Sequence, residues 1–266
     1  MNQPVADNPA EIYEQRFVPA LFQPWAERIA CRAAIMPGHS VLDVACGTGV
    51  LACAARQLSG DSGAVTGLDI NEQMLAVARR KSTCIDWRQG DAEELPFADA
   101  SFDAVISQFG FMFFEDKARA LRQMWRVLRP NGKMVVGVCS AIDHSPGYAV
   151  LAELLQRLFG VEIADAFRAP FSCGDRHALR IICEAAGLSQ ARVNRCEGQV
   201  RFPSIDALVS AERACAWTLG GLLDDAQFER LLIEATESLQ PFVDADGMVN
   251  FSMPASLIEI EKSDAE

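Results

Sequence analysis

Three acidic residues stand where their carboxylates could bind one small polar ligand. Asp43 and Asp69 each end an apolar stretch, and Asp91 follows a third such stretch. After Asp43 comes a turn with glycines at positions 47 and 49, and then an amphipathic run. A strand, a glycine turn and a helix in this order present backbone N–H groups to a ligand. The pattern therefore predicts a binding site built from the turn and the three acids.

The glycine turn alone leaves the ligand open. Residues 47–52 fit the pattern G-x-G-x-x-A, and Asp69 follows 20 residues after Gly49, as in a dinucleotide site. Asp43 favours a different ligand, because a carboxylate there would repel a pyrophosphate but attract an ammonium group. The chain also has no Tyr-x-x-x-Lys pair. A ligand with a ribose, an adenine and a zwitterionic end, but no phosphate, suits all three acids.

The elements that must position these acids alternate along the chain. The sequence predicts strands over 40–45, 64–70, 85–89, 102–107 and 133–138, and helices over 50–58, 72–81 and 117–128. This alternation predicts an α/β fold with a doubly wound, mainly parallel, Rossmann-like sheet. Ligands of such sheets bind beyond the carboxyl ends of the strands, which is where the three acids lie.

The regions around this core are predicted to add a helical cap. The predicted segments are a helical cap segment over 1–36 broken at Pro19 and Pro24, the binding core over 37–141, a helical cap insertion over 142–174, and completion of the sheet over 175–266. In the last segment we expect strands within 190–202 and 248–260, a helical insertion at about 205–240, and a helix over 176–186 capped by Asp175.

Four stretches carry motifs of a known family: VLDVACGTG from Val41, GLDINEQMLAVAR from Gly67, GDAEELPFADASFDAVIS from Gly90 and RALRQMWRVLRPNGKMVV from Arg119. Together they resemble the class I SAM-dependent methyltransferases, in the UbiE/MenG-like small-molecule branch. The resemblance covers about residues 41–138 and is loose outside them. It implies a seven-stranded sheet, S-adenosylmethionine as cofactor and S-adenosylhomocysteine as product.

The resemblance also implies roles for single residues. Asp43 and the turn Ala45, Gly47, Thr48 and Gly49 would hold the methionine part, Asp69 the ribose, Ile70 and Met74 the adenine face, Asp91 and Ala92 the adenine edge, Ser107 and Gln108 the sulfonium, and Tyr13 and Phe17 would close over the cofactor. Ala45 stands where the family more often has glycine, and we expect little consequence from alanine there if its φ stays negative.

Several of these residues also have a plain structural interpretation. Met74 can be core, Asp91 can be a turn residue, and Glu93 and Glu94 can be exposed charges or a helix start.

Methyl transfer from a sulfonium asks mainly for proximity, alignment and a dry site, and it requires no metal. A general base is needed only if the acceptor arrives protonated. His144, beside Asp143 and after the fifth predicted strand, is the candidate base; the alternative is an exposed loop histidine.

The segment QFGFMFF, residues 108–114, follows the fourth predicted strand at the ligand edge. Phe109, Gly110, Met112 and Phe113 are candidates for an apolar or aromatic acceptor pocket. The alternative is that these side chains belong to the core.

The composition and charge of the chain disfavour several classes of binding partner. The net charge is −12, and residues 201–266 hold thirteen acids against four cations, so binding to nucleic acid or anionic lipid lacks its usual source. No apolar stretch reaches the ~20 residues of a membrane span, and the first residues do not resemble a secretion signal. Nine scattered cysteines without a C-x-x-C pair are expected to be free thiols of a cytoplasmic protein.

These observations predict an S-adenosylmethionine-dependent methyltransferase acting on a small, apolar or aromatic molecule. Two alternatives stay open: an NAD-dependent reductase, and a protein that binds S-adenosylmethionine without transferring its methyl group. The sequence does not specify an oligomeric state.

Overall fold

The computed structural model describes residues 8–215 and 217–264, and within them the chain forms two compact units. The sheet unit comprises Gln23–Val138, Asp175–Cys196 and the chain from Ala255 onwards. The helical unit comprises the chain up to Phe22, Cys139–Gly174 and Glu197–Pro254. Because the chain passes from one unit to the other five times, neither unit is one continuous stretch of sequence.

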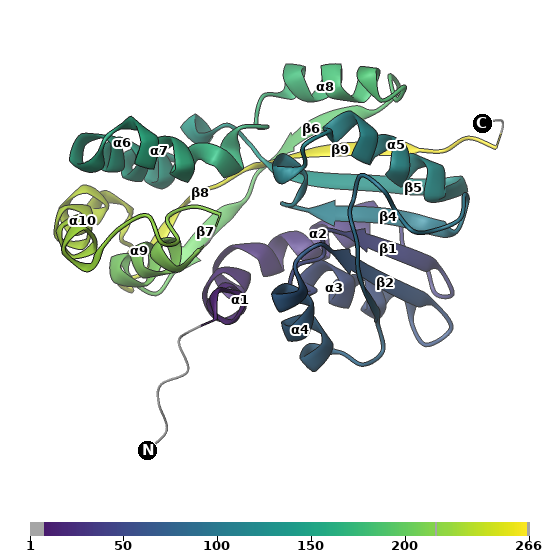
Figure 1. Cartoon of the computed structure of the whole chain (residues 1–266), viewed down its shortest axis with the longest axis horizontal. Coiled ribbons are helices and arrows are strands. Elements are labelled where there is room, and N and C mark those ends of the chain that lie inside the picture. Colours follow the sequence, from purple (N-terminus) through teal and green to yellow (C-terminus); the bar gives the residue numbers. More distant parts are fainter. Residues whose placement is uncertain (1–7, 216, 265–266) are drawn as a thin grey trace. The chain divides into compact units, whose positions relative to one another are not determined.

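The sheet unit is built on a seven-stranded sheet in the order β3-β2-β1-β4-β5-β9-β6 (Figure 1). Its strands are β1 Ser40–Val44, β2 Ala64–Asp69, β3 Asp86–Gln89, β4 Phe102–Gln108, β5 Leu128–Cys139, β6 Arg192–Cys196 and β9 Ala255–Glu261. The first five in chain order pair in parallel, and β6 is antiparallel to β9. The predicted doubly wound, mainly parallel sheet is confirmed.

The strand order reverses between β1 and β4. From β1 the chain proceeds through β2 to β3 at one edge, and from β4 it proceeds through β5 in the opposite direction. Parallel crossovers are right-handed, so the helices of the two halves cover opposite faces of the sheet. The carboxyl ends of β1 and β4 therefore form a topological switch point, the usual place for a ligand in such a sheet.

The helices of the sheet unit are α2 Gln23–Arg32, α3 Val50–Ser59, α4 Glu72–Lys81, the short η2 Phe111–Phe113, α5 Lys117–Val127 and α8 Arg176–Ala185. Helix α2 packs on α3, and α5 packs on α8. Side-chain caps set several helix starts. Asn71 accepts from the N–H groups of Gln73 and Met74, and Asp175 accepts from Ala178 as predicted.

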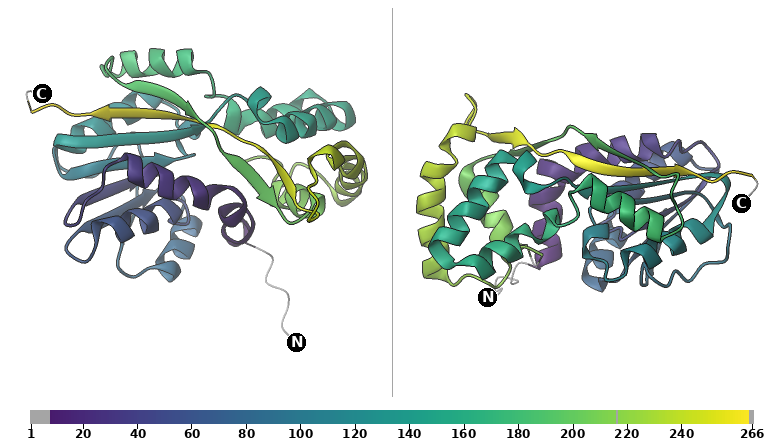
Figure 2. Two further views of the ribbon diagram at one scale, coloured as in Figure 1. Left: turned by 180° about the vertical axis from the view of Figure 1, so that it is seen from behind. Right: turned by 90° about the horizontal axis from the view of Figure 1, so that it is seen from above.

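The helical unit contains two longer helices, several short ones and a two-stranded sheet (Figure 2). Its elements are α1 Pro9–Ile12, η1 Tyr13–Phe22, η3 Ile142–His144, α6 Pro146–Phe159, α7 Val161–Arg168, η4 Ala169–Phe171, β7 Gln199–Phe202, α9 Ile205–Ala214, α10 Asp225–Ser238, η5 Gln240–Phe242 and β8 Val249–Ser252. Strands β7 and β8 pair antiparallel, and Tyr148 of α6 packs its ring against Phe251 of β8 at 5.1 Å between centroids.

The structure departs from the sequence expectations in three places. Neither Pro19 nor Pro24 breaks the first helical region: η1 is a π-helix that contains Pro19, and α2 starts one residue before Pro24. The wider turn of a π-helix accommodates proline, which has no backbone N–H to donate. Where the sequence predicts one strand within 190–202, the structure has two, β6 and β7, and where it predicts one within 248–260, the structure has β8 and β9. Strands β6 and β9 belong to the sheet unit, and β7 and β8 belong to the helical unit. The segment 23–36, expected in the cap, belongs to the sheet unit.

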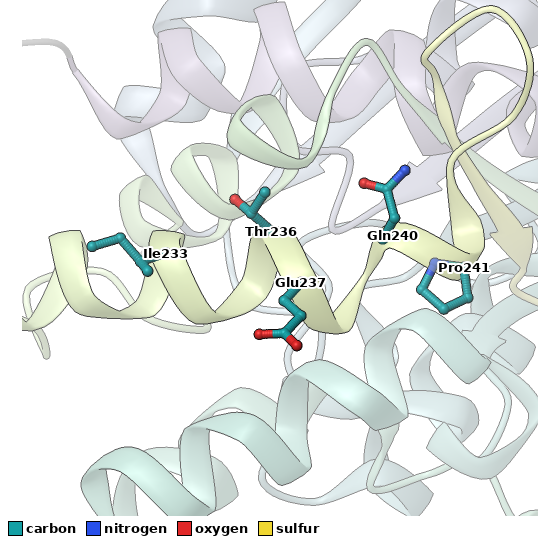
Figure 3. A pocket seen from close by; sticks show the side chains of 5 residues that line it. All are labelled: Ile233, Thr236, Glu237, Gln240 and Pro241. Atoms are coloured by element: carbon teal, nitrogen blue, oxygen red, sulfur yellow. The ribbon is translucent and has the colours of Figure 1, made fainter.

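In the described part of the chain, every helix is too short or too polar to cross a membrane. An open depression on the helical unit is lined by Ile233, Thr236, Glu237, Gln240 and Pro241 of α10 and η5 (Figure 3). None of the residues that the sequence assigns to a site lines it.

Candidate functional site

Asp43 lies on β1 at the switch point and is 1 % exposed. Neither of its carboxylate oxygens has a partner with ordinary hydrogen-bond geometry among the described residues. Burial holds the pKa of this carboxyl well above its usual value, a backbone hydrogen bond from Ala52 opposes that rise, and the charge of Asp69 adds to it. A buried carboxylate without a cation beside it is costly, so its presence calls for an explanation. The group it lacks is a cation or another strong donor.

The second acid, Asp69, holds the glycine turn in place. Its Oδ2 accepts from the N–H of Gly47 at 2.7 Å, and its Oδ1 accepts from Asn71 at 2.8 Å. Burial raises the pKa of Asp69, and the bonds from Asn71 and Gly47 oppose that rise. A carboxylate has about four lone-pair positions, so these two bonds leave capacity for ligand hydroxyls.

Three backbone N–H groups of the turn from Ala45 to Gly49 are already used in hydrogen bonds within the protein. The N–H groups of Cys46, Gly47 and Gly49 donate to Leu68, Asp69 and Cys46 respectively. Gly47 has φ +54°, and a Cβ added there would meet no atom within 4 Å. The open space for a ligand therefore lies beside Gly47. The Thr48 hydroxyl is buried and has no partner among the described residues.

The φ of Ala45 is not negative, so the condition under which alanine would have little consequence there is not met. Ala45 has φ +57°, and Phe109, just after β4, has φ +54°. Left-handed backbone at a non-glycine residue costs about 1–2 kcal/mol, so both strand ends at the switch point are strained. The two loops also approach each other closely, because a Cβ added to Gly110 would lie 2.5 Å from the Cβ of Ala45. Gly110 makes room for Ala45.

Trp87 of β3 supports the turn, and the sequence analysis did not single it out. A Cβ added to Gly49 would lie 2.3 Å from the Trp87 ring, and one added to Gly67 would lie 2.4 Å from it. The indole Nε1 donates to the carbonyl of Ser82 at 2.9 Å. Gly49 thus lacks a side chain because Trp87 occupies that space. A tryptophan in a four-residue strand was the signal available in the sequence.

The loop after β3 is anchored at both ends. Asp91 accepts from the N–H of Glu93, and Glu93 accepts from Glu115 and Asp116 at the start of α5. Arg126 of α5 donates to the carbonyls of Leu95 and Phe97 and pairs with Asp99 at 2.7 Å. Ala92 is buried. Asp91 and Ala92 therefore sit on a fixed loop, and their contact with adenine stays a prediction.

Other predicted cofactor residues differ in exposure. Ile70 is 70 % exposed directly after β2, while Met74 is buried in α4. Ser107 of β4 is fully buried, with a hydroxyl that has no partner among the described residues. Gln108 ends the same strand. The exposed Ile70 beside the carboxylate of Asp69 suits a face that an aromatic base would cover.

The predicted acceptor residues follow β4. Phe109 and Met112 are buried, and the Phe109 ring lies edge-on to Trp25 at 6.0 Å. Phe113 is 42 % exposed. Gly110 packs on Ala45, as described above. Their role in an acceptor pocket stays a prediction.

Three predicted site residues belong to the helical unit. Tyr13 and Phe17 lie in the π-helix η1, where Tyr13 stacks on Phe22 at 4.9 Å and Phe17 meets Phe202 edge-on. His144 ends the short helix η3 and is exposed, while Asp143 beside it is also exposed. Cofactor closure by Tyr13 and Phe17, and base catalysis by His144, remain predictions. Within the described chain, no group of three His, Cys, Asp or Glu side chains has a metal-site arrangement.

Comparison with known proteins decides the family. A family model described as a methyltransferase domain matches residues 42–136. The chain is 33% identical over 190 residues to a demethylmenaquinone methyltransferase of Staphylococcus aureus, covering 66% of this chain and 78% of that protein. The chain belongs to the class I S-adenosylmethionine-dependent methyltransferases of the UbiE type. The cofactor that this family membership implies is S-adenosylmethionine, which favours it over the nicotinamide alternative.

Two further comparisons show how much of the chain resembles known proteins. The methyltransferase is 40% identical over 126 residues to the ubiquinone/menaquinone biosynthesis C-methyltransferase UbiE of Pseudoalteromonas translucida, covering 45% of this chain and 50% of that protein. The chain spans about half the length of the first curated relatives it matches. Its fold is similar to that of a crystal structure from Bacillus halodurans titled a putative methyltransferase, with TM-score 0.60, 21% identity, and coverage of 90% of this chain and 98% of that one.

The residues of the site fit this cofactor. The buried carboxylate of Asp43, which has no ion-pair partner among the described residues, would match an ammonium group, and the open space beside Gly47 would let a ligand approach the backbone. Asp69 retains acceptor capacity for ribose hydroxyls. We propose that Asp43, Gly47 and Asp69 hold the methionine and ribose parts.

Proposed function

We propose that this methyltransferase transfers the methyl group of S-adenosylmethionine to a ring carbon of a small aromatic acceptor of the reduced-quinone type. The observation that carries the cofactor half of this proposal is the buried carboxylate of Asp43, which has no cation beside it among the described residues. The acceptor class is supported by the relatives, which are named for quinone methylation. It is also in keeping with the phenylalanine-rich segment after β4.

When bound, the cofactor supplies an electrophilic methyl group on a positively charged sulfur. The protein's own part is to hold and align. Asp43 would pair with the ammonium group, Asp69 would fix the ribose, and the strained turn at Ala45 would set the position of the backbone around them. Because the leaving group is already good, alignment and exclusion of water account for most of the acceleration.

The test is turnover with purified protein. S-adenosylmethionine labelled in its methyl group is incubated with reduced naphthoquinones and benzoquinones that lack a ring methyl group. We expect labelled product with a new C–CH₃ bond and one S-adenosylhomocysteine per methyl transferred, both measured by mass spectrometry. As a matched control, Asp43→Asn is expected to lose activity, while Asp61→Asn, at an exposed position, retains it.

Two results would contradict the proposal. Methylation at oxygen, nitrogen or sulfur of another acceptor would overturn the acceptor class. Tight binding of S-adenosylmethionine without turnover on any acceptor would favour the remaining alternative, a protein that binds the cofactor without transferring its methyl group.

A further inference from the structure

Two buried carboxyl groups lie diagonally across neighbouring strands of the sheet unit. Asp43 of β1 stands beside Gly67 of β2 in the register of the sheet, and Asp69 follows Gly67 by two residues. Because side chains two residues apart on a strand share a face, both acids lie on the same face of the sheet. Standard strand spacings place their Cα atoms about 8 Å apart. Asp43 is 1 % exposed and Asp69 is 8 % exposed.

Among the described residues, no Lys, Arg or His side chain forms an ion pair with either acid. The elements that pack against β1 are α3, β2 and β4. On α3 the titratable side chains are Cys53 and Arg56, and Arg56 pairs with Asp61. At the start of β4, Asp103 pairs with Arg129 at 2.7 Å. The cations near β1 are therefore already used by other acids.

A buried thiol lies on the same face as the two acids. A Cβ added to Gly67 would lie 3.0 Å from the Sγ of Cys46, which is buried in the turn after β1. Burial raises the pKa of the Cys46 thiol well above its usual value, and the charges of the two acids add to that rise. Cys46 therefore stays a neutral thiol and balances neither acid. Arg79 of the adjacent α4 is exposed and pairs with Glu72.

The two acids differ in the donors that stabilise their charged forms. Asp69 accepts from the N–H groups of Gly47 at 2.7 Å and Asn71 at 2.8 Å. For Asp43, burial holds the pKa well above its usual value, the charge of Asp69 adds to the rise, and the backbone N–H of Ala52 opposes it. Two carboxylates this close in a buried site do not both ionise readily. When no cofactor is bound, Asp43 is therefore the acid that keeps a proton.

An ammonium group brought to this site would reverse that preference. An opposite charge within about 4–6 Å favours the carboxylate form, so direct contact and contact through one water molecule both suffice. We propose that cofactor binding by this methyltransferase is a proton exchange, in which the ammonium group of S-adenosylmethionine displaces the proton of Asp43 into solvent. The inference rests on the proposed function and adds a regulation of the same site by pH. It involves residues of the sheet unit alone.

The exchange balances in atoms and in charge. The O–H bond of the Asp43 carboxyl group breaks, its electron pair stays on the carboxylate oxygen, and the proton leaves to water. The ammonium group keeps its own protons. A neutral carboxyl group and a cation thus become an ion pair and one proton in solution.

The exchange makes cofactor affinity depend on pH. Below the pKa of Asp43 in the free protein, each cofactor bound releases about one proton, so the association constant rises about tenfold per pH unit. Above that pKa the carboxylate is already formed, and the affinity gains nothing further. The methyltransferase therefore binds its cofactor least well in acid.

The first experiment counts protons by calorimetric titration of S-adenosylmethionine into the wild type at pH 5.5. At this pH an α-amino group, with a pKa of about 7.7–8.0, carries its proton. The titration is repeated in two buffers that differ in ionisation enthalpy, and the difference in heat gives the number of protons released. We expect about one proton per cofactor bound. Binding without proton release would overturn the inference.

Two further ligands locate the titrating group in the unaltered protein. S-adenosylhomocysteine has the ammonium group without the sulfonium, and we expect it to release about one proton as well. 5′-Methylthioadenosine has the adenine, the ribose and the thioether but no amino acid, and we expect it to release none. Release with 5′-methylthioadenosine would assign the proton to a group near the ribose, such as Asp69, and would overturn the assignment to Asp43.

The third experiment follows affinity against pH by equilibrium dialysis with labelled S-adenosylmethionine. Asp43→Asn has no proton to exchange, so its association constant should change by about twofold at most between pH 5 and pH 7. That of the wild type should rise about 10- to 100-fold, so the two proteins converge towards pH 5. Asp61→Asn, at an exposed position, is the control and should follow the wild type. Parallel curves for Asp43→Asn and the wild type would show that Asp43 exchanges no proton.

The outcomes separate the inference from the function on which it rests. Turnover of a quinol acceptor, together with parallel affinity curves, overturns the proton exchange and leaves the proposed function standing. Proton release with S-adenosylmethionine, but no turnover on any acceptor, overturns the proposed acceptor and leaves the exchange standing. Failure of the wild type to bind S-adenosylmethionine at any pH overturns both.

Discussion

At the scale of single residues, the site combines acids that the sequence identifies with strain that it does not. The spacing of Asp43, Asp69 and Asp91 predicted that the three acids lie at or just beyond the ends of neighbouring strands, and β1, β2 and β3 are neighbours in the sheet. The sequence predicted neither the positive φ of Ala45 nor its close approach to Gly110, 65 residues further along the chain. Such an approach depends on packing between loops rather than on local sequence.

Asp43 should lower the stability of the protein when no cofactor is bound. Its pKa in the folded state lies above the unfolded value of 3.8, so the folded state binds the proton more tightly. Stability therefore falls as pH rises through the folded pKa, and the loss is complete above it. Asp43→Asn should raise the free energy of unfolding at pH 8 by about 1–3 kcal/mol, measured by urea unfolding.

The same variant should bind the cofactor poorly. In calorimetric titration we expect affinity for S-adenosylmethionine to fall at least tenfold, because the ammonium group loses its partner. Asp61→Asn, exposed, should change neither quantity. A variant that is less stable than the wild type would show that Asp43 has a structural partner.

Glu212, buried on α9 of the helical unit, gives the stability of the protein a second dependence on pH. Its pKa moves from 4.5 in the unfolded chain to about 7 in the folded state. Stability is therefore lost between about pH 4.5 and pH 7, and at pH 8 the loss amounts to about 3 kcal/mol. In Glu212→Gln this part of the pH dependence should vanish, so the variant and the wild type should converge in unfolding free energy towards pH 5. If the unfolding free energies of the wild type and of Glu212→Gln ran parallel from pH 5 to pH 8, the raised pKa of Glu212 would be contradicted.

At the scale of elements, the alternation of strands and helices was predictable and their division between units was not. Residues 102–107 are apolar at most positions, which predicted a strand covered on both faces, and β4 occupies Phe102–Gln108. The chain near residues 197 and 254 gives no comparable signal, because each strand there is short and its partner is distant in sequence. Pro19 misled the analysis, since a π-helix is not recognisable from composition.

The ends of β1 and β4 should behave as one coupled element. Gly110 has φ −104°, which alanine adopts freely, so Gly110→Ala introduces only the clash with Ala45. We expect a loss of about 1–3 kcal/mol in unfolding free energy. In the background of Ala45→Gly the clash and the strain both disappear, and the loss should shrink by at least half in a double-mutant cycle.

Gly90→Ala serves as the control for that cycle, because its nearest neighbour is the end of the flexible Leu68 side chain. Its effect on the unfolding free energy should be the same in the wild type and in the Ala45→Gly background. Additive effects of Gly110→Ala and Ala45→Gly would mean that the two loops are not in contact.

Strand β3 should matter to the site through Trp87. Trp87→Leu removes the ring that fills the space over Gly49 and Gly67, and we expect a loss of about 2–3 kcal/mol in stability. The glycine turn would lose its support, so affinity for S-adenosylmethionine should fall as well, measured by calorimetry under conditions where the variant is folded. The stability and the affinity of Trp87→Phe should lie between those of the wild type and of Trp87→Leu. Unchanged affinity in a folded Trp87→Leu variant would show that the turn holds its shape without β3.

At the scale of the whole molecule, the two units are formed from interleaved segments. The family match covers residues 42–136, which lie within the sheet unit, yet β6 and β9 of that sheet come from later parts of the chain. The matched segment is therefore not an independent domain. Composition predicted a large core and a helical cap, while the interleaving could be known only from the fold.

This arrangement predicts the behaviour of a fragment. Residues 23–138 expressed alone would leave β5 as an open edge, without β9 beside it. An unpaired apolar edge strand favours aggregation, so we expect the fragment to be insoluble or to show no cooperative unfolding transition. Circular dichroism and size-exclusion chromatography would check this against the full chain. A folded fragment that binds S-adenosylmethionine would disprove the requirement for β9.

The position of β9 inside the sheet also bears on how the protein is made. β6 precedes β9 along the chain, yet it joins the sheet only through β9, which occupies Ala255–Glu261. While the ribosome is still adding residues before 261, β6 has no strand to pair with, and one side of β5 is bare. The sheet therefore keeps an open edge at β5 during translation until β9 has left the ribosome.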